Sequence, residues 1–269
     1  MVDSSQLYRI FAEQLAALRR SPYVDVCCVV RNGAASGTVA AGRGGLRWLR
    51  APMRKRLAYA LYTRWDRRHV RAMHDPLALV DASALLEKLS EVVVEPERHG
   101  FRQRFPAPAI DTLRRLDLDV LVRFGFGILD GEVLEVARHG IWSFHHGDNR
   151  RVRGTPPGLW ELIESHPHTG AVLQRLTSEL DGGHVLARGT YPTEAGLSAA
   201  RNRLAPYWGT SELLLLRLWQ LHAVAPSVLP QLPAEPYAGR RKIYRVPGNG
   251  DVVRWLSRAV ASGIRRRVT

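Results

Sequence analysis

Two segments of the chain carry residue types that could move a proton. Residues 143–148 read Ser-Phe-His-His-Gly-Asp, and residues 179–183 read Glu-Leu-Asp-Gly-Gly, with Arg153-Gly154 between them. An imidazole can donate or relay a proton, and a nearby carboxylate can hold the charge and the orientation of that imidazole. The sequence therefore predicts a proton-transfer site in which His145 and Asp181 form the proton-handling pair.

The order of these motifs resembles that of the folate-dependent formyltransferases. This family includes the glycinamide ribonucleotide, methionyl-tRNA and sugar-nucleotide amine formyltransferases, and its pattern is Asn-x-His, then Arg-Gly, then Leu-Asp-x-Gly. The resemblance covers about residues 105–190, and the matching residues are His145, Arg153-Gly154, Thr169-Gly170 and Leu180-Asp181-Gly182-Gly183. One position departs from the family, because Ser143 stands where the family has its asparagine.

The resemblance implies transfer of a formyl group from 10-formyltetrahydrofolate to a primary amine. Such a transfer passes through a tetrahedral intermediate with a negative oxygen, which needs donors aimed at it and an acceptor for the proton of the amine. In the family, the residues at the positions of Ser143, His145 and Asp181 share this work. The Ser143 hydroxyl lies closer to the backbone than an amide nitrogen would. Either a water bridges that gap, or the transition state is less well stabilised.

The resemblance also assigns the binding residues. Residues 126–129 look like the strand-end segment that lines the pterin pocket, and the expected folate-binding set is Phe126, Gly127, Ile128, Leu129, Leu176, Glu179, Leu180 and Asp181. The acceptor is expected beside His146, Asp148, Arg153 and Gly154. His146 should point to the strand face opposite to His145. Asp148 either orders its loop or contacts the amine. No metal site is expected, because adjacent histidines diverge on a strand.

The acceptor is expected to be a small molecule, with an amino sugar nucleotide as the candidate. The segment after His222 is too short for the C-terminal β-barrel domain of the methionyl-tRNA enzymes. Two alternatives keep the same fold: a 10-formyltetrahydrofolate hydrolase that uses water as acceptor, and a catalytically silent protein that binds folate. A third alternative is a basic protein associated with a membrane surface or with nucleic acid.

The chain alternates strand-like and helical periods, which predicts a Rossmann-like α/β fold with a mostly parallel sheet flanked by helices. Ligands of such sheets bind at the carboxyl ends of the strands, and His145 falls at one such end. The family begins with a strand, whereas this chain begins almost directly with a helix that Asp3 or Ser4 could cap, so the first strand is expected to be missing. Strand-like runs are 24–30, 92–94, 120–124, 141–144 and 172–176, and helical runs are 5–18, 109–116, 132–137, 158–165 and 211–222.

Composition supports a cytoplasmic protein. The chain has 269 residues of which 45% are hydrophobic, enough for a full core, and no apolar run reaches the ~18 residues of a membrane span. Cys27 and Cys28 are neighbours within an apolar run and lack Cys-x-x-Cys spacing, so they are expected to be reduced core residues.

Two basic segments carry much of the net charge of +14. Residues 43–71 form an expected basic amphipathic helix, inserted in a catalytic domain that spans 1–225. Its apolar face could pack on the sheet or lie on an anionic membrane. Residues 226–269 are expected to form a proline-rich linker and a semi-ordered basic tail that could touch lipid, nucleic acid or an acidic partner. The charge would also attract phosphate-bearing ligands, yet no nucleic-acid-binding motif accompanies it.

Overall fold

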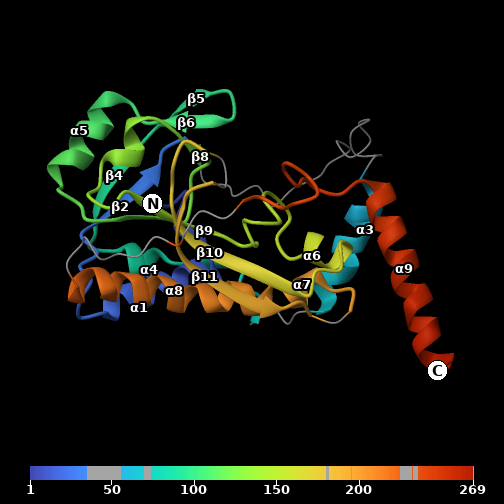
Figure 1. The fold of residues 1–269 in the computed structure, drawn as a ribbon. Helices are drawn as coiled ribbons and strands as arrows, with labels where there is room; N and C mark the ends of the chain where they lie inside the picture. The colour runs from blue at the N-terminus through green and yellow to red at the C-terminus, as the bar shows by residue number, and fades with distance from the viewer. Residues whose placement is uncertain are drawn as a thin grey trace.

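A computed structural model describes residues 1–34, 56–69, 74–179, 182–194, 196–224, 232 and 236–268. The chain folds as a mixed α/β protein in which strands form a central layer with helices beside it (Figure 1). This is the predicted α/β fold class, but the expectation of a mostly parallel sheet is wrong for the main sheet, because β10 (His168–Arg175) pairs antiparallel with both of its neighbours.

The main sheet has four strands in the order β11-β10-β9-β7. β7 (Leu121–Arg123) runs parallel to β9 (Ile141–His145), β10 (His168–Arg175) runs antiparallel to β9, and β11 (His184–Pro192) pairs with β10. All five residues of β9 are buried. Alternate side chains of a strand point to opposite faces. Trp142 and Phe144 accordingly pack in the cluster that includes Leu18 of α1 (Arg9–Arg20) and Leu214 of α8 (Leu204–Ala223), the two helices that lie along one side of the sheet (Figure 1).

A second, two-stranded parallel sheet joins β2 (Cys28–Asn32) to β4 (Ser90–Val94), and residues 1 and 2 connect it to the main sheet. The amino group of Met1 donates to the carbonyl of Val122 at 2.8 Å, and the amide of Val2 donates to the carbonyl of Val30 at 2.9 Å. Burial lowers the pKa of the Met1 amino group to about 5. A cavity of about 630 Å³ lies beside these two residues, lined by parts of β2, β7, α1 and α8, and His145 does not line it.

The first helix begins later than the sequence predicted. Residues of β1 (Gln6–Tyr8) pair with β3 (Leu79–Asp81), so the backbone is extended up to Tyr8 and α1 starts at Arg9. The predicted capping by Asp3 or Ser4 is therefore wrong. Asp3 instead accepts hydrogen bonds from the amide of Phe126 and the side chain of Asn32, both at 2.8 Å.

A smaller unit lies above the main sheet (Figure 1). It contains the three-stranded sheet β5-β6-β8, with β5 (Glu97–His99), β6 (Arg102–Arg104) and β8 (Ile128–Leu129). Its helix α5 (Ala107–Arg115) buries Ile110 and Leu113, three residues apart on one face. The predicted helix 132–137 is only a 3₁₀ turn, η4 (Glu132–Glu135). The short helix α4 (Ser83–Leu86) precedes β4.

The C-terminal segment packs against the rest of the chain. Helix α9 (Asn249–Val268) lies beside α3 (Leu57–Asp66) in Figure 1, and its Trp255 packs with Tyr62 and with Trp160 of α6 (Trp160–Ile163). The expectation of a semi-ordered tail is thus wrong for residues 244–260, because Tyr244, Val252 and Trp255 are buried in this cluster. The division into 1–225 and 226–269 stays a prediction.

Leu57, Leu61 and Trp65 recur at helical spacing and make up part of the apolar face expected for residues 43–71, but helix α3 buries a different face. These three side chains are exposed, whereas Tyr62 and Asp66 are buried. Hydrogen bonds explain which face is buried. The Asp66 carboxylate accepts a hydrogen bond at 2.6 Å from Ser198, the residue before α7 (Ala199–Asn202). The Tyr62 hydroxyl donates to the carbonyl of Leu197. After α3 comes one turn, η2 (Arg67–His69). The rest of the predicted basic helix, 43–55 and 70–71, lies outside the described residues.

Both cysteines are free, but only Cys28 is partly buried and Cys27 is exposed, so the predicted core position of Cys27 is wrong. In the part of the chain that the structure describes, no helix has the length and the apolar character to cross a membrane.

Candidate active site

Ser143 and His145 lie on the same face of β9, two residues apart. They are 2% and 8% exposed, respectively. Ile141, on that same face, packs in the apolar cluster that contains Phe126 and Leu129. The register of the sheet places Arg123 of β7 on one side of Ser143 and Gln174 of β10 on the other. We call Arg123, Ser143 and Gln174 the buried row.

His145 is held by the backbone of the following loop. Its Nε2 lies 2.9 Å from the carbonyl oxygen of Val152. Because a carbonyl only accepts, Nε2 must carry the hydrogen, and in the neutral ring Nδ1 is then the basic nitrogen. The loop thus fixes which nitrogen of His145 can take up or release a proton.

Within the buried row, Arg123 forms a direct hydrogen bond with Ser143. Its Nε donates to Ser143 Oγ at 3.0 Å, and its Nη1 donates to the carbonyl of Gly127 at 2.7 Å. Gln174 is 3% exposed, and its Oε1 has no hydrogen-bond partner among the described residues. The position of the family's asparagine is therefore surrounded by two further polar side chains.

His146 faces away from His145, as strand alternation predicts. Its ring stacks on Tyr207 of α8, with centroids 3.6 Å apart and planes 4° apart. Burial, with a smaller contribution from His145, lowers the pKa of His146 to about 3, so its ring is neutral. This stack gives His146 a packing role, and contact with an acceptor stays a prediction.

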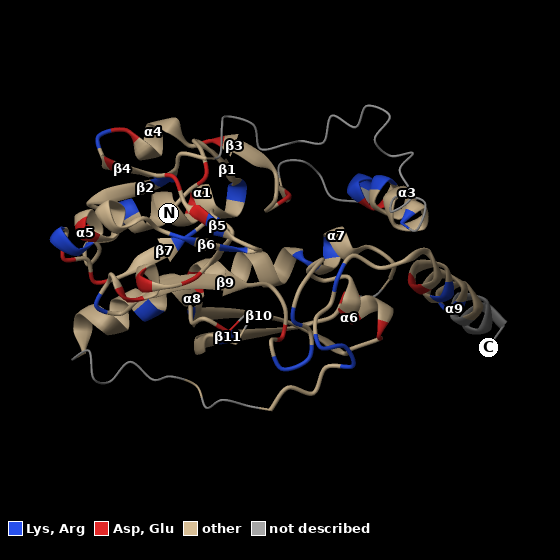
Figure 2. Cartoon of the chain, turned by 90° about the horizontal axis from the view of Figure 1, so that it is seen from above, with Lys and Arg blue, Asp and Glu red and all other residues tan. Residues whose placement is uncertain are grey.

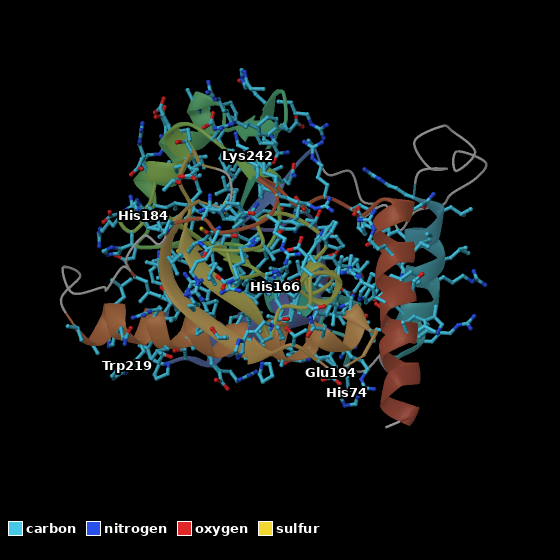
Figure 3. All side chains as sticks on the ribbon, turned by 45° about the vertical axis from the view of Figure 1, so that its right-hand side comes forward. His74, His166, His184, Glu194, Trp219 and Lys242 are labelled. Atoms are coloured by element: carbon cyan, nitrogen blue, oxygen red, sulfur yellow. The ribbon has the colours of Figure 1, made fainter. Side chains whose placement is uncertain are left out.

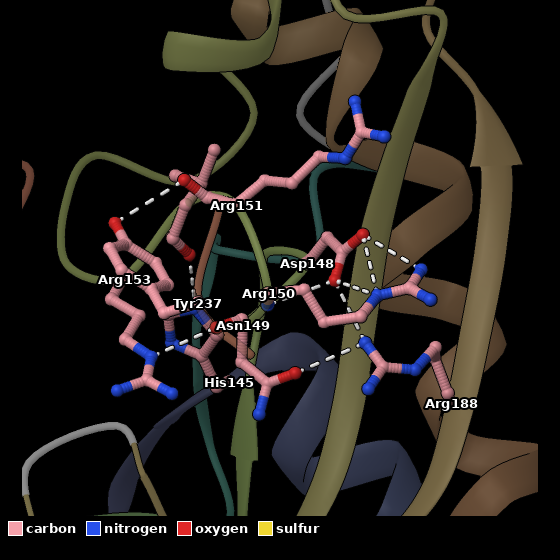
Figure 4. Close-up of polar contacts among 9 residues, drawn as sticks. His145, Asp148, Asn149, Arg150, Arg151, Arg153, Arg188 and Tyr237 are labelled. Carbon is pink, nitrogen blue, oxygen red and sulfur yellow. Dashed lines mark hydrogen bonds and ion pairs between the residues drawn. The ribbon is translucent and has the colours of Figure 1, made fainter. Parts of the chain in front are cut away.

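The loop after His145 is ordered by charged side chains (Figure 4). Asp148 accepts from Nε of Arg150 and from Nη1 of Arg188 on β11, each at 2.8 Å. It also accepts from the backbone amide of Arg150 at 3.1 Å, which is an Asx-turn contact. Burial alone would raise the pKa of Asp148, but the hydrogen bonds and charges of Arg150 and Arg188 outweigh it and hold that pKa below its usual value. Asp148 therefore orders the loop as an anion.

Arg153 and Gly154 anchor the far end of this loop, which we call the arginine loop (148–154). The guanidinium of Arg153 lies 4.7 Å from the ring centre of Tyr237 (Figure 4). Gly154 has a φ of 114°, and a Cβ there would lie 2.1 Å from the carbonyl oxygen of Tyr244. The amide of Tyr244 donates to the carbonyl of Arg153 at 2.7 Å. Only glycine allows this approach of the C-terminal segment to the loop.

A buried carboxyl lies behind the arginine loop. Glu161 of α6 is 1% exposed, and neither of its carboxylate oxygens has a hydrogen-bond partner among the described residues. Burial raises the pKa of Glu161 to about 7, and the negative charges of Asp148 and Glu164 add to this. Glu164 itself contacts His166, which lies in the turn after α6 (Figure 3).

The two predicted walls of the pterin pocket come together. Phe126 and Leu129 are buried in one apolar cluster, and Leu176 packs against it. Their contact with a pterin stays a prediction. Several backbone groups of this segment already have partners, because the amide of Gly127 binds Gln103 at 2.6 Å and its carbonyl binds Arg123. A pterin would compete with these contacts or use other groups.

The predicted acidic turn is described only at its edges. Leu180 and Asp181 lie outside the described residues. Glu179, two positions before Asp181, accepts from Nη1 of Arg153 at 3.1 Å, which ties the turn to the arginine loop. The pairing of His145 with Asp181 stays a prediction. The described ranges contain no cluster of three or more side chains that could hold a metal ion.

Sequence reasoning missed Arg123, Gln174, Arg188, Tyr237 and Tyr244. Arg123 and Gln174 could have been found from the pairing order of the strands, since both lie opposite Ser143. No local sequence pattern predicts the other three, because their partners lie about 40 to 90 residues away in the chain.

Comparison with known proteins agrees with the motifs. The methionyl-tRNA formyltransferase of Phenylobacterium zucineum is 37% identical over 124 residues, which cover 43% of this chain and 40% of that protein. That of Prochlorococcus marinus is 32% identical over 80 residues, which cover 29% of this chain and 24% of that protein. The chain is related to the folate-dependent formyltransferases. No protein-family model matches it.

The formyltransferase fold extends beyond these local matches. Glycinamide ribonucleotide transformylase 1 of Symbiobacterium toebii aligns with a TM-score of 0.50 at 14% identity, covering 90% of this chain and 92% of that one. This likeness shows a common fold. The chain spans only about a quarter to two fifths of the length of the curated formyltransferases it matches.

Proposed function

We propose that this chain transfers the formyl group of 10-formyltetrahydrofolate to the primary amine of a small, phosphate-bearing acceptor, with an amino sugar nucleotide as the candidate. The observation that carries the proposal is the shared face of β9, on which Ser143 and His145 lie beside the apolar cluster of Phe126 and Leu129. The related sequences and the common fold support the same chemistry.

In this reaction the amine nitrogen attacks the formyl carbon, and a bond from nitrogen to carbon forms while the carbonyl oxygen gains negative charge. The bond from that carbon to N10 of the folate then breaks, and N10 receives a proton as the amine loses one. Nδ1 of His145 is the atom that we assign to this proton or to the oxyanion. Asp181 would hold the charge and orientation of that ring.

The arginine loop supports a phosphate-bearing acceptor. Arg150, Arg151 and Arg153 follow His145, and the segment that contacts them carries further cations: Arg240, Arg241, Lys242 and Arg245. Figure 2 shows basic residues gathered on the loops beside α6. Asp148 balances one charge of the pair Arg150 and Arg188. The excess positive charge favours phosphate groups near the reacting amine.

The test is to incubate the protein with 10-formyltetrahydrofolate and one acceptor at a time, measuring tetrahydrofolate release and the mass of the formylated product. The acceptors are nucleotide-linked amino sugars, the same sugars without nucleotide, aminoacylated initiator tRNA, and no amine. We expect release to depend on a nucleotide-linked amine. Formate release without any amine would identify a hydrolase instead. Folate binding without turnover would identify a silent binding protein, and no binding at millimolar folate would refute the proposal.

A further inference from the structure

The side chain of Ser143 is hydrogen-bonded to the guanidinium of Arg123, which can donate hydrogen bonds but cannot accept them. A guanidinium has no hydrogen-bond acceptor and stays protonated, so in the contact of 3.0 Å between Arg123 Nε and Ser143 Oγ the serine oxygen must accept. The hydroxyl hydrogen of Ser143 is then left to donate elsewhere. Among the described residues this hydroxyl donates no hydrogen bond, although the side chain is only 2% exposed.

Arg123 is fixed in place by the segment predicted to bind the pterin. Its Nη1 donates to the carbonyl of Gly127 at 2.7 Å and lies 3.5 Å from that of Phe126. The planar guanidinium therefore has its orientation set on one side by residues 126–127 and on the other by Ser143. A hydroxyl that accepts a charge-assisted hydrogen bond becomes a stronger donor, because chains of hydrogen bonds polarise one another.

We propose that Arg123 is a positioning residue for formyl transfer: it orients and polarises the Ser143 hydroxyl, which then donates its hydrogen to the oxyanion in place of the family's asparagine. This inference rests on the proposed function. It also gives a different interpretation of the serine that replaces the family's asparagine at position 143. The shorter side chain of Ser143 is compensated by the cation of Arg123 on the neighbouring strand.

Gln174 is the competing candidate for the missing donor. It lies opposite Ser143 on β10, and its Oε1 has no partner among the described residues. Among the described residues, the amide of Gln174 makes no hydrogen bond to the Ser143 side chain, whereas Arg123 contacts Ser143 directly. The geometry therefore favours Arg123, and Gln174→Met serves as the discriminating variant.

The experiment is a double-mutant cycle of Arg123→Met and Ser143→Ala, measured as kcat and KM for tetrahydrofolate release. Loss of one oxyanion donor costs about 10²–10³ in turnover, and loss of its polarising partner should cost about ten-fold. We expect Arg123→Met to lower kcat about ten-fold in the wild-type background and less than about two-fold in the Ser143→Ala background, because the arginine acts through the hydroxyl. KM and the folate dissociation constant should stay within about three-fold.

Three further variants separate positioning from a structural role. The asparagine in Ser143→Asn has its own N–H donor, so kcat of this variant should equal or exceed the wild-type value. In the Ser143→Asn background, Arg123→Met should then change kcat very little. Arg123→Lys should recover part of the loss, since it keeps the charge. Arg114→Met is the matched control and should leave kcat unchanged. Arg114 lies on the surface of α5 and forms an ion pair with the exposed Glu132 of η4.

Equal losses from Arg123→Met in the wild-type and Ser143→Ala backgrounds would overturn the inference. So would a loss that appears only in KM and folate affinity, which would assign Arg123 to the folate wall alone. A large kcat loss in Gln174→Met with none in Arg123→Met would transfer the role to Gln174. A wild-type protein that releases no tetrahydrofolate with any acceptor or with water would overturn the proposed function and this inference together.

Discussion

The buried row and the arginine loop lie next to each other but are held by different means. In the row, the sheet register places Arg123 and Gln174 on either side of Ser143. In the loop, Arg153 and Gly154 owe their positions to Tyr237 and Tyr244 of the C-terminal segment, through one ring contact and two backbone hydrogen bonds.

This difference separates two kinds of task. Strand register is rigid, so the row can hold donors at fixed distances from a reacting carbon. The loop depends on a distant segment and carries charge at the surface, which suits recognition of an acceptor. Variants in and beside the row should therefore change kcat, and variants in the loop should change acceptor KM and local stability.

His145→Ala should have the largest effect. Removal of a general acid or base costs about 10²–10⁴ in turnover, and we expect kcat to fall within that range. The folate dissociation constant should change little, whereas the free energy of unfolding should fall by about 1–3 kcal/mol, because the Val152 carbonyl loses its buried hydrogen-bond donor. Steady-state kinetics and calorimetry provide these values. A variant that keeps more than a third of the wild-type kcat would remove His145 from the chemistry.

Gly154→Ala tests whether the C-terminal segment holds the loop. The new Cβ would lie 2.1 Å from the Tyr244 carbonyl oxygen at a φ of 114°, so backbone contacts must separate. We expect a loss of about 2–3 kcal/mol in urea unfolding and a rise in acceptor KM. Gly250→Ala is the control, since a Cβ at Gly250 meets no atom within 4 Å. Equal stability of the two variants would show that the loop does not need this contact.

Glu161→Gln should stabilise the protein in a pH-dependent way. The pKa of Glu161 is about 7 in the folded chain against 4.5 for an unperturbed glutamate. Because the pKa of Glu161 is higher in the folded chain than in the unfolded chain, ionisation of this carboxyl destabilises the fold. The cost in free energy is absent below pH 4.5 and complete above pH 7. We expect Glu161→Gln to raise the free energy of unfolding by about 3 kcal/mol at pH 8 and by almost nothing at pH 4.5. Glu132→Gln, at an exposed glutamate, is the control and should leave the free energy of unfolding unchanged at both pH values. A gain of the same size at both pH values would show that ionisation is not the cause.

Arg153→Met should have the smallest effect. Arg153 is partly exposed and has three contacts, with Tyr237, Asn149 and Glu179, so its loss removes one positive charge and loosens the loop. We expect acceptor KM to rise about three- to ten-fold with kcat nearly unchanged, and more so at low ionic strength. Arg138→Met, at a surface ion pair with Asp117, is the control. A fall in kcat without a change in KM would place Arg153 in the chemistry and remove the division between row and loop.

Much of the fold followed from local patterns. The alternation of apolar strands and amphipathic helices predicted β4, β7, β9 and β10 within a few residues, because short runs rich in valine and isoleucine favour strands. Helix α1 was misplaced at its start, since pairing of residues 6–8 with β3 overrides helical periodicity. The packing face of α3 was wrong for a similar reason. Its leucines follow helical spacing, but hydrogen bonds at Tyr62 and Asp66 decide which face is buried.

The candidate site divides in the same way. The sequence by itself determined that His145 lies at the end of a strand, that His146 points away from it, and that the family's asparagine is replaced by serine. Those conclusions need only the two-residue period of a strand and the order of motifs. Only the tertiary structure decided that Arg123 donates a hydrogen bond to Ser143, that Tyr244 contacts Gly154, and that the carboxylate of Glu161 is buried with no hydrogen-bond partner in the part of the chain that the structure describes. Each depends on the burial or the pairing of segments distant in the chain, which composition and local periodicity do not encode.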